Sequence, residues 1–400
     1  MTNPDPGRKT ITGLAAAHLV TDIYMPVLPA ILPLLVLNNG YSYFTAGLLI
    51  TAYNVTSSFT QPIFGWLSDT RGLAVHVSIS LLISAVFVGL MGIAQNYYLI
   101  MAFAVIAALG HACFHPAALS MVSRLCTSEN RGRITSYFVV GGNLGYAIGP
   151  VLAGAVVWWI GLPGLLFLII PAAVMALALR RILPGGITGG RTFSDTRSAP
   201  GNSGAHSKKP FMILMVASVL RSWAIFAAIT FLPMYLVAQG YDLFMATLIV
   251  TLMLLAGVCG QVVGGHISDR YGRKEFVIIA LTCSVPFFYL FLISQGITAI
   301  IAILLFGFTL WSTFAVSVAM SHELLPQNVG LASGIMLGLA IGFGGLGVAV
   351  NGIIADHYSL AAALGTIPLP IIGAVILMAI LPYPWKAFRN RMQGTREQGI

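Results

Sequence analysis

Charged side chains are scarce in this chain, and the shortage excludes whole classes of protein. Only 8% of its 400 residues are Asp, Glu, Lys or Arg, against roughly 25% in soluble domains. A soluble domain of this size cannot keep its surface hydrated with so little charge. A cytosolic enzyme, a nucleic-acid-binding protein and a disordered chain are therefore excluded, and no enzymatic activity is expected.

Cysteine is also sparse: the chain has four cysteines, which lie in or at the ends of apolar runs. Their spacing fits neither a disulfide framework nor a metal site, so we expect free thiols and no bound metal. No G-x-x-x-x-G-K-[ST] loop occurs, so ATP does not drive the protein through such a loop, and no cofactor is expected. The four cysteines are Cys113, Cys126, Cys259 and Cys283.

Hydrophobic residues make up 58% of the chain and are gathered into long runs. A helix needs about 20 apolar residues to cross the hydrocarbon core of a membrane, and twelve runs are long enough. The first run exceeds the apolar region of a signal peptide, which has about 7–15 residues. The sequence therefore predicts an all-α membrane protein with twelve transmembrane helices, at residues 11–37, 43–68, 73–95, 97–126, 133–158, 162–182, 211–238, 243–268, 275–296, 297–323, 329–357 and 359–383.

The distribution of basic residues predicts the orientation in the membrane. Nineteen of the 20 Lys and Arg residues lie in the termini and in alternate loops, all on one side of the predicted bilayer. Loops rich in Lys and Arg remain in the cytoplasm. We therefore expect a multi-pass protein of the inner (plasma) membrane with both termini cytoplasmic. The remaining basic residue, Arg221, lies within the seventh predicted helix.

A segment rich in Gly and Ser, residues 183–209, divides the predicted helices into two groups of six. Segments of this composition behave as flexible linkers. The expected organisation is an N-terminal six-helix bundle at 1–182, this cytoplasmic linker, a C-terminal six-helix bundle at 210–383 and a cytoplasmic tail at 384–400. We expect the protein to be a monomer.

The two predicted bundles resemble each other in sequence. The segment GWLSDTRG begins at Gly65 after the second helix, and GHISDRYG begins at Gly265 after the eighth, an offset of 200 residues (265 − 65). A tandem duplication explains this recurrence better than chance does. Parallel repeats with a substrate site between them characterise one large class of transporters.

The repeated motif, G-x-L-x-D-x-x-G, resembles the signature of the major facilitator superfamily. The resemblance implies two pseudo-symmetric halves of six helices, the major facilitator fold, with helices 1, 4, 7 and 10 around a central cavity. In the first copy, Leu73-Ala74 stand where the family has an Arg-Lys pair, so we expect a weaker ion network there. The resemblance also implies cytoplasmic gating by Gly65, Asp69, Arg71, Gly265, Asp269 and Arg273.

The fifth predicted helix resembles the G-x-x-x-G-P signature of the superfamily's antiporters, at Gly145, Gly149 and Pro150. Glycines four residues apart let two helices touch, and proline bends a helix, so simple packing is the alternative. Many drug antiporters carry a buried Arg in helix 4, but Ile106 stands there, so a proton scheme using that Arg does not transfer. Four patches resemble fosmidomycin-resistance-type efflux proteins: Ala17–Asp22, Phe114–Pro116, Gly141–Asn143 and Arg221–Trp223.

Four ionisable residues besides Arg221 are expected inside the membrane, where such groups cost several kcal/mol and so suggest function. His18 and Asp22 share one helix face, as do His111 and His115, because four residues make about one turn. One interpretation is a proton site at Asp22 with the three histidines. A metal site is the second, since imidazole and carboxylate are metal ligands. In the third, the histidines bond to carbonyls or waters and only stabilise the bundle.

The remaining candidates concern the substrate. Arg221 is a candidate anchor for an anionic group, and the structural alternative is a permanent salt bridge to Asp22. Trp223 and Trp311 are candidates for the wall of an apolar pocket, although core or lipid-facing packing also explains them. Asn143 and Tyr24 complete the predicted substrate-binding residues.

The sequence thus predicts a secondary transporter whose partners are the lipid bilayer, protons and a small-molecule substrate. We expect a proton-coupled antiporter that exports a small amphipathic or anionic compound by alternating access. Proton-coupled symport for uptake is the alternative within transport. A non-transporting receptor or scaffold on the same fold is the alternative outside it.

Overall fold

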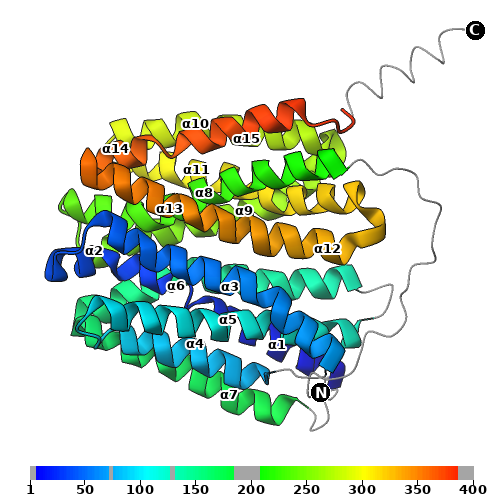
Figure 1. The fold of residues 1–400 in the computed structure, drawn as a ribbon, viewed down its shortest axis with the longest axis horizontal. Coiled ribbons are helices and arrows are strands. Elements are labelled where there is room, and N and C mark those ends of the chain that lie inside the picture. The colour runs from blue at the N-terminus through cyan, green and yellow to red at the C-terminus, as the bar shows by residue number, and fades with distance from the viewer. Residues whose placement is uncertain (1–5, 72–74, 127–130, 184–207, 386–400) are drawn as a thin grey trace, which may run out of the picture. The chain divides into compact units, whose positions relative to one another are not determined.

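The computed structural model describes all residues except 1–5, 72–74, 127–130, 184–207 and 386–400. The described residues form helices joined by short turns, and no strand occurs among them (Figure 1). Most of the predicted linker and the end of the predicted tail lie outside the described residues. All four cysteines are free, as predicted.

Each of the twelve predicted segments contains one or more helices, and this confirms the all-α class. The first six segments contain α1 (Pro6–Asp22), α2 (Val27–Asn39), α3 (Tyr43–Arg71), α4 (Val77–Met91), α5 (Tyr97–Leu125), α6 (Arg131–Ile160), η1 (Leu162–Leu168) and α7 (Ile169–Ile182). The last six contain α8 (Lys208–Ala238), α9 (Leu243–Tyr271), α10 (Arg273–Ile293), α11 (Gly296–Leu324), η2 (Pro326–Asn328), α12 (Val329–Gly334), η3 (Ile335–Leu339), α13 (Ala340–His357), α14 (Leu360–Gly365) and α15 (Pro368–Ile380).

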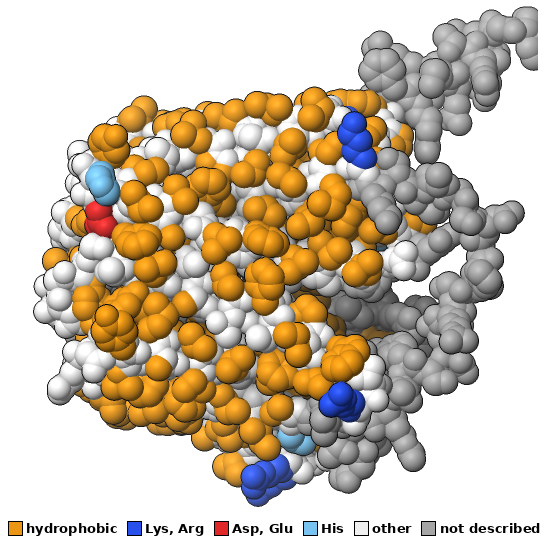
Figure 2. Space-filling model, in the orientation of Figure 1, with side chains coloured by type: hydrophobic (Ala, Val, Ile, Leu, Met, Phe, Trp, Pro, Cys, Tyr) orange, Lys and Arg blue, Asp and Glu red, His pale blue; other side chains and the backbone are white. Residues whose placement is uncertain are grey.

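Ten helical segments of the described chain are long and apolar enough to cross a membrane, and α4 is a shorter apolar helix. The helix α3 has 29 residues, which is sufficient length, but its middle carries Asn54, Ser57, Ser58 and Gln61. Large hydrophobic side chains are exposed along many of the helices, and hydrophobic side chains are spread over the face drawn in Figure 2. Such a surface suits contact with lipid rather than water.

Four of the predicted membrane spans are not single α-helices: the sixth begins with the 3-10 helix η1, and the twelfth is divided into α14 and α15. The first breaks after Asp22, and the chain turns through Ile23–Pro26 before α2 begins at Val27. Proline has no N–H and a fixed φ, so Pro26 favours the start of a new helix over continuation of the old one. The eleventh span contains a π-helical turn, η3, between α12 and α13, and such turns are frequent at functional sites.

Contacts between residues divide the chain into two compact units. Unit 1 contains Met1–Arg197, Ile229–Thr251 and Val348–Leu360, and unit 2 contains Ser198–Ala228, Leu252–Gly347 and Ala361–Ile400. In unit 1, α1 packs against α6, while α3 and α4 pack against α5. In unit 2, α10 packs against α11 and α15. The expected bundle boundaries, 1–182 and 210–383, remain a prediction.

Candidate functional site

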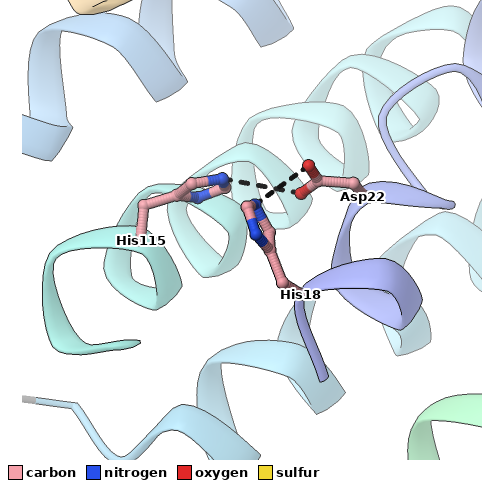
Figure 3. Close-up of side chains that lie close together, drawn as sticks. All are labelled: His18, Asp22 and His115. Carbon is pink, nitrogen blue, oxygen red and sulfur yellow. Dashed lines mark ion pairs between the residues drawn. The ribbon is translucent and has the colours of Figure 1, made fainter. Parts of the chain in front are cut away.

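Three of the four predicted proton-coupling residues meet in unit 1 (Figure 3). His18 and Asp22 come from the last turns of α1, and His115 comes from α5. Nε2 of His18 lies 3.1 Å from Oδ2 of Asp22, and Nε2 of His115 lies 3.5 Å from Oδ1 of the same carboxylate. Asp22 and His115, which come from two different helices, therefore face each other.

Backbone carbonyls fix the tautomer of both histidine rings. Nδ1 of His18 lies 2.8 Å from the carbonyl oxygen of Phe138, and Nδ1 of His115 lies 3.0 Å from that of His111. A carbonyl oxygen only accepts hydrogen bonds, so Nδ1 must donate in each ring. In a neutral histidine the lone pair is then on Nε2, which faces the carboxylate of Asp22. When Asp22 is ionised and both histidines are neutral, no proton therefore lies between the carboxylate and either Nε2 atom.

The glycines of α6 determine how closely α1 approaches this cluster. A Cβ atom at Gly141 would lie 2.5 Å from the carbonyl oxygen of Ala15, and one at Gly145 would meet that of Leu19. One at Gly149 would meet the carbonyl of Ile23. Glycines four residues apart thus form a track on which the backbone of α1 lies. The predicted antiporter motif has this packing geometry, and α6 continues through Pro150 without a break.

Gly142 opens the space that the cluster itself occupies. A Cβ atom at this position would meet the imidazole of His18 and lie 2.6 Å from Oδ2 of Asp22. The ring of His18 also stacks on Phe138 of the same helix, with ring centroids 4.2 Å apart. Gly142 and Phe138 are functional candidates that the sequence reasoning missed. The sequence signal that could have identified Gly142 is its position directly after Gly141, which begins the series of glycines four residues apart.

The side chains of the cluster are also potential metal ligands, as the second interpretation of the sequence requires. His18, Asp22 and His115 each offer one ligand atom, and these atoms lie within 4.8 Å of one another. Closed structural zinc sites use four protein ligands. His111, the fourth predicted donor, is not part of this group. Its side chain is buried, and its Nδ1 has no hydrogen-bond partner among the described residues. The cluster can hold a cation, but it falls short of a closed four-ligand site.

The candidates Tyr24 and Asn143 lie in the same unit. Tyr24 is fully buried, and its hydroxyl donates to the carbonyl of Leu168 at 2.8 Å, which ties the break between α1 and α2 to η1. This hydrogen bond favours a packing role for Tyr24. Asn143 follows Gly142 on α6 and is partly exposed.

The predicted substrate residues of the second half lie in unit 2. Arg221 of α8 is only 2% exposed, and its guanidinium carbon lies 5.0 Å from the ring centre of Phe314 on α11. Trp223 packs against Gly347 of α13, where a Cβ atom would meet the indole ring. Trp311 packs against Gly257 of α9, where a Cβ atom would lie 2.9 Å from its own Cβ. Both tryptophans therefore have at least a packing function.

The predicted gating residues of the second half form an ion network in unit 2. Arg273 lies 3.2 Å from Oδ1 of Asp269 and 2.8 Å from Oε1 of Glu323. The hydroxyl of Tyr383 donates to Glu323. Tyr383 follows the end of α15, and its burial, together with this hydrogen bond, raises the pKa of its phenol. A cavity of about 270 Å³ is lined by Ser268, Asp269, Gly272, Arg273, Glu323, Tyr383, Pro384 and Trp385.

Only part of the first copy of the motif lies within the described residues. The side chain of Asp69 lies outside the described residues, as do the residues that replace the Arg-Lys pair. The guanidinium carbon of Arg71 lies 5.6 Å from the ring centre of Trp66. A Cβ atom at Gly65 would make an ordinary contact of 3.7 Å with Pro116, and one at Gly265 would meet nothing within 4 Å. Close helix packing therefore does not require glycine at either position.

Lys274 beside the second motif is a further residue that the sequence reasoning missed. It was counted as a loop charge, yet it is only 2% exposed. Its ammonium donates to the carbonyls of Ala379 at 3.0 Å and Leu381 at 2.7 Å. It also lies 4.3 Å from the ring centre of Trp385. Lys274 thus satisfies the carbonyls at the end of α15 and holds the following residues against the start of α10.

Comparisons with known proteins agree with this architecture. A family model described as Major Facilitator Superfamily matches residues 11–346 and 242–394. The fosmidomycin resistance protein of Escherichia coli (strain K12) is 28% identical over 374 residues, covering 91% of this chain and 91% of the relative. The sialic acid transporter NanX of the same organism is 22% identical over 399 residues, covering 97% and 96%.

A solved structure has the same fold. The crystal structure of a bacterial homologue of the human lysosomal transporter Spinster superimposes with a TM-score of 0.78, covering 95% of this chain and 96% of that one, at 15% identity. Fold, family model and relatives point to one assignment. The chain belongs to the major facilitator superfamily and is a multi-pass membrane transporter rather than an enzyme.

Proposed function

We propose that the protein is a proton-coupled antiporter of the inner membrane that exports a small amphipathic or anionic compound by alternating access. Both termini are cytoplasmic, and the protein acts as a monomer. The observation that carries the proposal is the cluster of His18, Asp22 and His115, in which both Nε2 atoms face one carboxylate. In such a cluster, a proton can bind between the carboxylate and an Nε2 atom and can leave again without a change in which residues are in contact.

Protonation changes the charge of this cluster. With Asp22 ionised and both histidines neutral, its net charge is −1, and one proton makes it neutral. A charge inside the membrane has a high free energy, so the neutral and charged forms favour different conformations of the surrounding helices. Proton and substrate then bias the same two-state equilibrium, which is what coupling requires. His111 lies beside the cluster, its ring centre 4.5 Å from that of His115, and completes the proposed proton-coupling residues.

Other proposed roles follow the family resemblance. Arg221, Trp223, Trp311 and Asn143 contribute to substrate binding. Tyr24, the other predicted substrate residue, supports α1 and α2 in this proposal, and its hydrogen bond to Leu168 is the observation that favours this role. Gly145, Gly149 and Pro150 serve the antiporter function by keeping α1 and its Asp22 against α6. Gating of the cytoplasmic mouth is assigned to Gly65, Asp69, Arg71, Gly265, Asp269 and Arg273.

The names of the relatives support the two parts of this proposal unequally. Resistance, in the name of the Escherichia coli fosmidomycin resistance protein, supports export. The name of the sialic acid transporter supports an organic acid as substrate and sets no direction. Proton-coupled uptake by symport is therefore the second candidate, and it uses the same cluster. A receptor or scaffold without transport is the third, and a buried proton site has no role in it.

The replacement Asp22→Asn tests the proposal because it keeps the shape of the side chain and removes its charge. We expect it to abolish proton-driven accumulation in proteoliposomes and to keep counterflow, the exchange of labelled for unlabelled substrate without a gradient. Retained counterflow shows that the variant folds and binds. The control is His357→Ala, an exposed histidine outside the cluster, which should transport as the wild type does. Undiminished uphill transport by Asp22→Asn would refute the coupling role of this cluster.

A further inference from the structure

Arg221 is a buried cation, two of whose nitrogen atoms have no hydrogen-bond partner in the part of the chain that the structure describes. Its Nε and Nη1 atoms are buried and have no hydrogen-bond partner among the described residues. The ring of Phe314 lies against one face of the guanidinium. Such a cation–π contact does not supply a hydrogen-bond acceptor to the N–H groups at the edge of the guanidinium. The edge that carries these N–H donors is therefore left without an acceptor.

Lys274 provides a comparison within the same unit. It is equally buried, at 2% exposed, yet its ammonium donates to two carbonyls and lies over Trp385. Arg273, which is more exposed, pairs with two carboxylates. Unit 2 thus supplies acceptors to the cations that stabilise it. Arg221 differs from both, which argues against a structural role within unit 2.

The helix α13 crosses α8 closely at the two residues that follow Arg221. A Cβ atom at Gly344 of α13 would lie 2.5 Å from Cβ of Ser222 and 2.9 Å from the backbone nitrogen of Trp223. The same span contains the π-helical turn at Ile335–Leu339. Glycine at this crossing lets α13 approach α8 closely, and π-helical turns are frequent at functional sites. The printed aromatic neighbour of the guanidinium is the ring of Phe314 on α11.

We propose that Arg221 binds an oxyanion of the transported compound, a carboxylate, phosphonate or sulfonate, through the edge of its guanidinium. The inference rests on the proposed transport function and narrows its substrate class from amphipathic or anionic to anionic. A guanidinium forms paired, charge-assisted hydrogen bonds with planar or tetrahedral oxyanions, which an ammonium does not reproduce. The ring of Phe314 beside the guanidinium favours a compound whose remainder is apolar or aromatic.

Binding to the purified protein in phospholipid-free detergent tests the inference. The probes are benzoate and phenylphosphonate, each paired with an uncharged analogue, benzamide and diethyl phenylphosphonate. We expect the wild type to bind at least one anion in preference to its analogue. A charge-assisted hydrogen bond contributes about 10- to 100-fold in affinity. Arg221→Gln should therefore lower the affinity for the anion at least tenfold and spare the uncharged analogue.

Two further variants sharpen the test. Arg221→Lys should restore little of the affinity, because the ammonium lacks the paired geometry. Lys209→Gln removes an exposed cation from the same helix and should bind as the wild type does. Without ligand, Arg221→Gln should melt at or above the temperature of the wild type, since an unsatisfied charge has been removed. A lower melting temperature that Asp22→Asn restores would reveal a structural ion pair and overturn the inference.

The other outcomes are equally decisive. Failure of the wild type to prefer any anion, or equal anion affinity in Arg221→Gln, would overturn the inference. Stabilisation by phosphatidylglycerol alone would assign Arg221 to a lipid headgroup and would also overturn it. These measurements use no proton gradient, so their failure leaves the proton-coupling proposal intact. Conversely, an Asp22→Asn variant that still transports uphill leaves the anion site intact.

Discussion

Substitution of Gly142 by Ala perturbs the proposed proton site through one methyl group. The added Cβ would meet the imidazole of His18 and lie 2.6 Å from Oδ2 of Asp22. Carbon contacts are optimal at about 3.5–4.0 Å, so the carboxylate must retreat by about 1 Å. The distance of 3.1 Å between Nε2 of His18 and Oδ2 of Asp22 then exceeds hydrogen-bond length. Overpacking of this kind costs about 1–3 kcal/mol.

The expected result is a folded protein with impaired coupling, because the displaced atoms are the ends of side chains rather than backbone. At 1.4 kcal/mol for each factor of ten, the rate of proton-driven transport should fall about fivefold to a hundredfold. Gly365→Ala, where a Cβ atom meets nothing within 4 Å, should be neutral. Gly145→Ala meets the backbone of Leu19 and should lower the melting temperature instead. Wild-type coupled transport by Gly142→Ala would refute the reasoning.

Three more predictions concern orientation, gating and stability. In a Cys-free variant, single cysteines at Asn39 and Gln239 should react with an impermeant maleimide from outside, and one at Asn202 should react only after permeabilisation; external labelling at Asn202 would reverse the topology. Arg273→Gln breaks both ion pairs of the Arg273 network and should slow turnover more than Asp269→Asn, which breaks one of those two; equal rates would contradict this. Lys274→Met leaves two carbonyls without their hydrogen-bond donor and should lower the free energy of unfolding by about 2 kcal/mol. The measurement is the melting temperature, which should be lower than that of the control variant Lys209→Met; equal melting temperatures would contradict the prediction.

The sequence was sufficient for the helices because their length and hydropathy are local properties. Each predicted span corresponds to a helical segment, and the four-residue spacing correctly placed His18 beside Asp22. The break after Asp22 was missed, although Pro26 is a local signal for it. Long apolar runs conceal such breaks, because hydropathy is unchanged across them.

The partners of the site residues could not be predicted, because they depend on which helices pack together. The carbonyl of Phe138, which fixes the tautomer of His18, lies 120 positions away in the chain. Lys274 counted toward the orientation as a loop charge, yet the end of α15 buries it. The sequence pattern of a charge does not reveal whether a distant carbonyl satisfies it.

The pH inside substrate-loaded proteoliposomes tests the central claim most directly. Vesicles that contain an anion bound in the assay above are diluted into substrate-free buffer of equal pH, with valinomycin and equal potassium on both sides to clamp the membrane potential. As the compound leaves, an antiporter brings protons in, so the account predicts that the lumen becomes acidic with wild-type protein and not with Asp22→Asn. A lumen that becomes alkaline would indicate symport, and an unchanged pH would indicate no coupling; either result would contradict the account.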